Sequence, residues 1–72
     1  MADRRRRFPP PWDIEEHNRS CFIVMDANRF PVCYVYFESE PGRRAAAKLM
    51  TRDEARRIAA NIAKLPSLPV KT

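Results

Sequence analysis

Cys21-Phe22-Ile23-Val24-Met25, a short polar turn and then Val32-Cys33-Tyr34-Val35-Tyr36-Phe37 form the stretch of sequence that decides the fold. Neither apolar run alternates apolar and polar residues, as a strand with one solvent-exposed face does. We therefore expect a small sheet that is covered on both faces. A single helix follows to cover one face, and a second copy of the chain is the simplest cover for the other.

Shorter elements flank these two strands. Residues 12–16 alternate in polarity and predict a first strand, and the polar residues 17–20 predict a turn. Asp26-Ala27-Asn28-Arg29 predicts the turn between the apolar strands, the second of which covers residues 31–38. Residues 45–49 fit either a weak fourth strand or a helical turn, and we expect the strand.

The clearest element is a helix that begins after Thr51. Thr51 and Glu54 have the spacing of a capping box, in which each side chain bonds the other residue's backbone amide. One apolar face follows at helical spacing, and Pro66 ends the helix. The residues of this face are Ala55, Ile58, Ala59, Ile62 and Leu65. We expect the face, Ile58 included, to form the core with the sheet.

The predicted fold class is α+β, a three- or four-stranded antiparallel meander followed by one C-terminal helix in the order β-β-β-(β)-α. Residues 1–7 predict a disordered basic tail, 8–66 a single domain and 67–72 a flexible tail. The chain has neither an apolar run near the roughly 20 residues of a membrane span nor the apolar region of a secretory signal. We therefore expect a cytoplasmic protein with no membrane partner.

The length of the turn decides which side chains share a face of the sheet. A two-residue turn places Cys21 and Cys33 on opposite faces, whereas a three-residue turn places them on one. For the three-residue turn, one face carries Cys21, Ile23, Met25, Cys33, Val35 and Phe37. The other face carries Phe22, Val24, Val32, Tyr34 and Tyr36. We expect self-association through this second face, because tyrosine is enriched at interfaces.

Several motifs within residues 8–68 resemble those of a group of short, uncharacterised bacterial proteins. They are Pro11-Trp12, Asp26-Ala27-Asn28, Tyr34-Val35-Tyr36-Phe37 and the run LMTRDEARRIAANIAKLP at 49–66. Similar proteins usually have glycine where Arg29 stands, so a left-handed residue is not expected at the end of this turn. The resemblance implies a bacterial, cytoplasmic setting and no particular activity.

Catalytic and metal chemistry have few candidates in this chain. His17, Cys21 and Cys33 are the only soft-metal ligands, and they lack the paired spacing of zinc sites. The sequence has no nucleophile with an adjacent base and no glycine-rich phosphate loop. We therefore expect no catalytic residue, no metal ligand and no cofactor.

The net charge of +5 comes from basic residues at the N-terminus and around the helix, while the sheet region is acidic. Two interpretations are open: an anionic partner, or attraction between the acidic and basic parts of the chain. The candidate contacts to nucleic acid are Arg4, Arg5, Arg6, Arg7, Arg43, Arg44, Lys48, Arg52, Arg56 and Lys64. Our leading hypothesis is a non-enzymatic interaction module that forms a homodimer or binds a protein partner, and nucleic-acid binding is the alternative.

Overall fold

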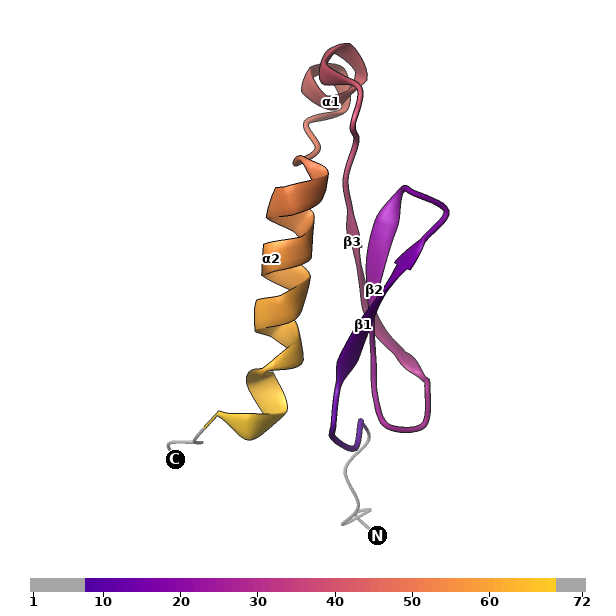
Figure 1. Ribbon diagram of the computed structural model, residues 1–72, viewed down its shortest axis with the longest axis vertical. Helices are drawn as coiled ribbons and strands as arrows, with labels where there is room; N and C mark the ends of the chain where they lie inside the picture. The colour runs from indigo at the N-terminus through magenta and orange to yellow at the C-terminus, as the bar shows by residue number, and fades with distance from the viewer. Residues whose placement is uncertain (1–7, 69–72) are drawn as a thin grey trace, which may run out of the picture.

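The computed structural model describes residues 8–68 (Figure 1). Strands β1 (Asp13–His17), β2 (Cys21–Met25) and β3 (Pro31–Tyr36) form an antiparallel sheet in the order β1-β2-β3. Helices α1 (Pro41–Ala47) and α2 (Arg52–Ala63) follow, and a 3-10 turn covers Leu65–Ser67. The predicted α+β class is confirmed. The tails predicted at 1–7 and 67–72 lie outside the described residues, except for residues 67 and 68.

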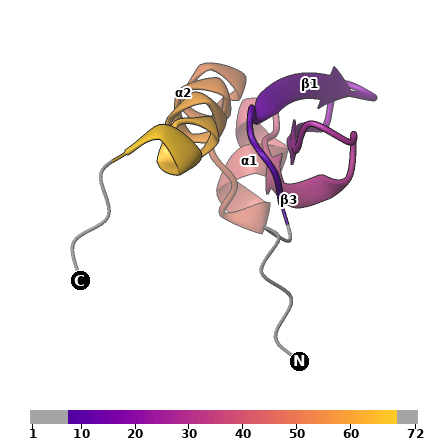
Figure 2. The same ribbon diagram turned by 90° about the horizontal axis from the view of Figure 1, so that it is seen from below.

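Helix α2 lies along one face of the sheet, mainly over β2, and within residues 8–68 it is the only α-helix that packs on the strands. Figure 2 shows α2 on one side of the sheet, with β1 and β3 at the two edges. The core between them is thin and consists of Phe22, Val24, Val35, Phe37, Ala55 and Ala59. Since both helical residues of this core are alanines, the helix backbone can approach the sheet closely.

A β-bulge sets the register between β2 and β3. Met25 pairs with Pro31, as a three-residue turn requires, but Val24 pairs with Cys33. Val32 is the extra residue on β3, and beyond it every pair is shifted by one position. Because such a shift moves each side chain of one strand to the other face relative to its neighbour, the bulge decides the composition of both faces.

The faces expected from the three-residue turn are therefore wrong. Phe22 pairs with Val35 and lies under α2, whereas Ile23 pairs with Tyr34 on the opposite face. Cys21 pairs with Tyr36, so it lies on the face away from the helix. The two cysteines consequently point to opposite faces, as the two-residue alternative required, and both are free thiols.

Asp26 organises the turn between β2 and β3. Its side chain is buried, and its Oδ1 accepts hydrogen bonds from the amides of Asn28 (2.8 Å) and Phe30 (2.9 Å). Arg29 has a φ of 66°, in the left-handed region. The expectation that an arginine here would prevent a left-handed residue is therefore wrong, because the buried carboxylate holds the turn around it. The turn expected at residues 17–20 is present at 18–20, and His17 is the last residue of β1.

The strand expected at residues 45–49 is wrong, because this part of the chain belongs to α1 and its C-terminal end. The Glu40 carboxylate accepts a hydrogen bond from the Gly42 amide (3.0 Å), and Pro41 occupies the first helical position, where its missing N–H is not needed. Lys48 ends the helix with a φ of 58°. None of the residues of α1 is buried.

The capping box of α2 is confirmed. Thr51 Oγ1 accepts from the Glu54 amide (3.1 Å), and Glu54 Oε1 accepts from the Thr51 amide (2.8 Å). The placement of Ile58 in the core is wrong, because its side chain is 42% exposed while Ala55 and Ala59 are fully buried. A three-stranded sheet is too narrow to cover the whole apolar stripe of the helix.

Candidate interaction surface

Strand β3 is an edge strand. Along Pro31–Tyr36, β2 is the only segment among the described residues that pairs with it. The Phe37 amide donates to the Ser20 carbonyl (3.0 Å). Since inward and outward groups alternate along an antiparallel ladder, the amides and carbonyls of Tyr36 and Tyr34 point away from β2. Beyond β3, the Glu38 amide bonds the Met50 carbonyl (3.0 Å), which marks the end of the open stretch.

Two tyrosines border this open edge on the face away from α2. Tyr34 is 50% exposed and Tyr36 is 52% exposed, and their rings stack with centroids 6.3 Å apart and planes 16° apart. Ile23 lies opposite Tyr34 on β2 and is half-buried. Together they form an apolar area on the solvent-facing side of the sheet.

Helix α2 contributes a second apolar border. At about 100° per residue, Ile58 lies on one flank of the helix axis, and Leu65 continues this flank in the 3-10 turn just beyond the helix. Arg52 lies on the other flank, where it bonds Glu16 of β1. The flank that carries Ile58 therefore faces the β3 side, and Leu65 is 52% exposed there.

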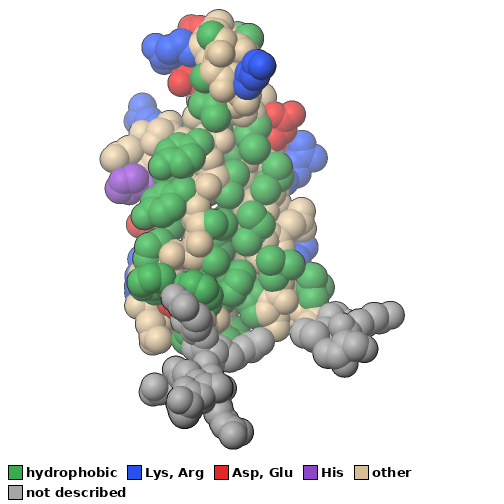
Figure 3. Space-filling view, turned by 180° about the vertical axis from the view of Figure 1, so that it is seen from behind, with side chains coloured by type: hydrophobic (Ala, Val, Ile, Leu, Met, Phe, Trp, Pro, Cys, Tyr) green, Lys and Arg blue, Asp and Glu red, His purple; other side chains and the backbone are tan. Residues whose placement is uncertain are grey.

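We name these features together the β3 edge surface. It comprises the outer backbone edge of β3 and the side chains of Tyr34, Tyr36, Ile58 and Leu65. The space-filling view from behind (Figure 3) shows hydrophobic side chains in a broad band along the sheet and α2, with charged groups at its margins. Exposed apolar areas of this kind mark interaction sites in soluble proteins.

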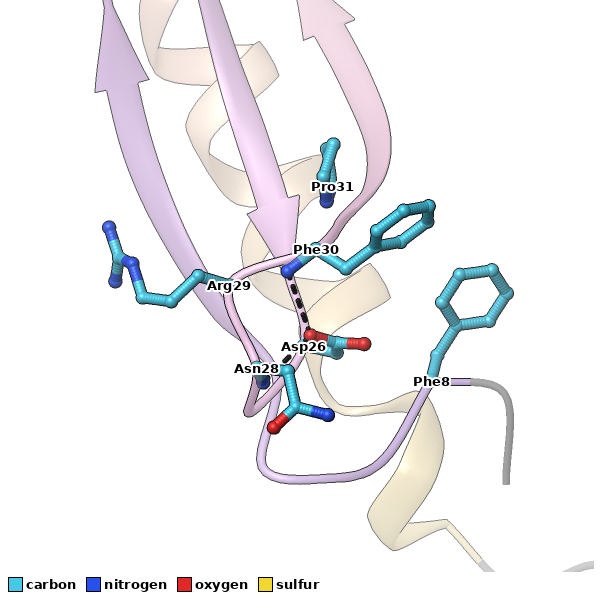
Figure 4. Close-up of a pocket in the computed structure, with 6 residues that line it drawn as sticks. All are labelled: Phe8, Asp26, Asn28, Arg29, Phe30 and Pro31. Carbon is cyan, nitrogen blue, oxygen red and sulfur yellow. Dashed lines mark hydrogen bonds between the residues drawn. The ribbon is translucent and has the colours of Figure 1, made fainter. Parts of the chain in front are cut away.

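A hollow of about 450 Å³ lies beside the turn between β2 and β3 and is lined by Phe8, Asp26, Asn28, Arg29, Phe30 and Pro31. Figure 4 shows the rings of Phe8 and Phe30 on one side of the turn, while Arg29 extends to the other. Arg29 bonds Glu15 (2.7 Å), and one oxygen of Asp26 holds the turn amides. The lining residues thus include no nucleophile beside a general base.

Several of the basic residues proposed as nucleic-acid contacts bind carboxylates of the same chain. Arg52 pairs with Glu16 and also lies over the Phe22 ring, 5.4 Å from its centroid. The Arg52 guanidinium lowers the pKa of Glu16. Arg43 pairs with Glu38 (3.2 Å). This confirms attraction between the basic and acidic parts of the chain.

The remaining basic candidates are dispersed. Arg44 donates to the Glu38 carbonyl (3.4 Å), and Arg56 lies 4.0 Å from Asp53. Lys48 and Lys64 follow the last residues of α1 and α2. Arg4, Arg5, Arg6 and Arg7 lie outside the described residues.

The structure separates the residues that were expected to share a self-association face. Phe22 and Val24 are buried under α2, and Val32 packs partly against the same core. Tyr34 and Tyr36 alone of this set remain exposed on the opposite face. The sequence interpretation also missed Ile58 and Leu65 as surface residues. The signal that could have identified them is the width of the apolar stripe, which is greater than three strands can cover.

The soft-metal ligands are also separated. Cys33 lies on the helix side of the sheet, and burial raises the pKa of its thiol. Cys21 and His17 lie on the other side by strand alternation. Among residues 8–68, the structure brings no three histidine, cysteine or acidic side chains together in an arrangement suited to a metal ion.

Comparisons with known proteins found no matching family model, no matching curated protein and no matching solved structure. The helices within residues 8–68 are too short or too polar to cross a membrane. The function that we propose therefore rests on the β3 edge surface and on the charges around it.

Proposed function

We propose that this protein is a small non-enzymatic interaction module that self-associates through its sheet. One observation carries the proposal: β3 presents an open, uncharged edge with exposed apolar side chains on both sides. A chain of this size buries only about 60% of its unfolded surface, so it gains stability when such a surface is covered. Self-association supplies this cover.

The ion pairs of the arginines favour this function over nucleic-acid binding. Arg43 and Arg52 are bound to carboxylates, so each must exchange an intramolecular partner for a phosphate before it can hold nucleic acid. We expect binding of duplex DNA or single-stranded RNA to be weak and to disappear at physiological salt. Tight binding that persists at physiological salt and requires residues 43–64 would instead favour the nucleic-acid alternative.

Sedimentation velocity of the full chain over a range of concentrations tests self-association. We expect a dimer whose population depends strongly on concentration and weakly on salt. Ile58→Asp places a charge within the β3 edge surface and should give a folded monomer, because this residue is 42% exposed. Ala46→Glu, on the exposed helix α1, adds the same charge elsewhere and should leave the dimer intact. A wild-type chain that is monomeric at every concentration would contradict the proposal.

A further inference from the structure

We infer that two copies of the chain pair antiparallel through β3, so that their sheets join into one six-stranded sheet around a two-fold axis. The inference rests on the proposed self-association and specifies its geometry. The β3 edge rather than the tyrosine-bearing face alone then holds the two copies together. Three observations support this arrangement.

The first observation is the direction of the backbone groups. The Phe37 amide points to Ser20, the residue before β2, so the amides and carbonyls of Tyr36 and Tyr34 point outward. These are the groups that an added antiparallel strand would bond. Between Pro31 and Tyr36, no described segment other than β2 pairs with this strand.

The second observation is that β3 lacks the usual protection of an edge over most of its length. Natural edge strands carry charged side chains, proline in mid-strand, an inward-pointing charge or a β-bulge, which prevent pairing between molecules. The strand Pro-Val-Cys-Tyr-Val-Tyr at 31–36 has no charged residue, its proline stands at the first position, and its bulge lies at Val32, so residues 33–36 carry none of these features. The other edge strand, β1, carries Asp13, Glu15 and Glu16. The two edges thus differ in composition, and β3 is the edge suited to pairing.

The third observation is that the edge and its two borders are self-complementary. With a two-fold axis at Tyr34, this residue lies opposite its own copy and Val35 lies opposite Cys33 of the second copy on the face of the helices. The tyrosine rings of both copies then adjoin on one face. A second copy therefore provides strand, aromatic and apolar partners without any further segment.

The α2 helices fit the same arrangement. Strands lie about 4.8 Å apart, so β2 and its counterpart would be about 14 Å apart across the paired β3 strands. A helix with its side chains is about 10–12 Å wide, so two helices centred on these strands approach each other at their flanks. The flanks that meet are those that carry Ile58 and Leu65, whose exposed side chains would then be shielded from water.

Proline and threonine at position 34 separate backbone pairing from side-chain contact. Tyr34→Pro removes an amide that points away from β2, so all hydrogen bonds between β2 and β3 are kept. Edge strands accept proline at such positions. Tyr34→Thr removes the same ring but keeps the amide. In sedimentation velocity, we expect the dimer of the proline variant to have a dissociation constant at least roughly tenfold higher than that of the threonine variant. Circular dichroism establishes whether each variant is folded.

Amide hydrogen exchange of the wild-type chain tests the same geometry without a substitution. In the dimer, the amides of Tyr34 and Tyr36 should be protected, and dilution to the monomer should remove this protection. The Phe37 amide, which bonds Ser20, is the internal reference and should remain protected in both states.

The outcomes distinguish this inference from the function on which it rests. A wild-type dimer in which the Tyr34 and Tyr36 amides exchange freely, or a folded proline variant that dimerises as well as the threonine variant, would overturn edge pairing but leave self-association standing. A wild-type monomer would overturn both. Protection that arises only when an unrelated extended peptide is added would show that the edge accepts a different partner.

Discussion

The register of the sheet predicts that Phe22 and Phe37 depend on each other for stability. Their ring centroids are 5.4 Å apart, and both side chains are 3% exposed beneath α2. Tyr36 is the neighbour of Phe37 in sequence but lies on the opposite face and is 52% exposed. A double-mutant cycle should therefore find coupling between Phe22 and Phe37 and none between Phe22 and Tyr36.

The expected magnitudes permit the measurement. Phe22→Leu and Phe37→Leu should each lower the free energy of unfolding by roughly 1–2 kcal/mol. The contact between the two rings should contribute about 0.5–1.5 kcal/mol of coupling energy. At the usual stability per residue, a chain of this length has an unfolding free energy of roughly 4–11 kcal/mol. The two losses together amount to roughly 2–4 kcal/mol, which is below most of this range, so the double variant should remain folded.

Urea unfolding at one protein concentration provides the assay, followed by circular dichroism and by the fluorescence of Trp12, the single tryptophan. The indole of Trp12 bonds the Phe8 carbonyl (2.9 Å), so its environment should change on unfolding. Additivity of Phe22→Leu and Phe37→Leu within about 0.3 kcal/mol would refute the register. Coupling of Phe22→Leu with Tyr36→Leu would refute it as well.

Three further predictions concern α2. Thr51→Ala should destabilise the protein by about 1 kcal/mol in thermal unfolding while Thr51→Ser should not, and equal stabilities would exclude a capping role. The hydrogen bond from the Thr51 amide lowers the pKa of Glu54, so its contribution is present above about pH 4.3 and is lost as the pH falls through the folded pKa. In urea unfolding, the free energy of unfolding of Glu54→Gln should accordingly fall less between neutral and acidic pH than that of the wild type. The same fall in both proteins would contradict this. Ala59→Leu should cost about 1–3 kcal/mol because Ala59 is fully buried, whereas Ala60→Leu should cost less, and the reverse order would place the helix differently on the sheet.

Local signals in the sequence were sufficient for some elements. The capping box needs only Thr51 and Glu54, which bond each other within one helical turn, so no distant contact can alter it. The hairpin turns likewise depend on a few neighbouring residues. Helix α1 also has a local signal, because Pro41 suits the first helical position, but glutamate is not among the preferred capping residues, so Glu40 does not indicate a helix start.

Features that depend on several elements could not be predicted in this way. The bulge at Val32 has no sequence signal, yet it decides which side chains lie under the helix. The exposure of Ile58 depends on the width of the sheet relative to the helix. The spacing of apolar residues along the helix gives no information on this width. These two features explain why the expected self-association face was wrong in composition although Tyr34 and Tyr36 do lie on an exposed face.

The bulge also affects which changes in chain length the strand can tolerate. Val32 stands between the pair Met25–Pro31 and the pair Val24–Cys33, so its deletion would leave both pairs in place and make the ladder regular. Deletion of Val35, by contrast, would draw Tyr36 toward the core and Phe37 toward solvent. Among natural or engineered versions of this chain, loss of one residue should therefore be compatible with the fold at position 32 and incompatible with it further along β3.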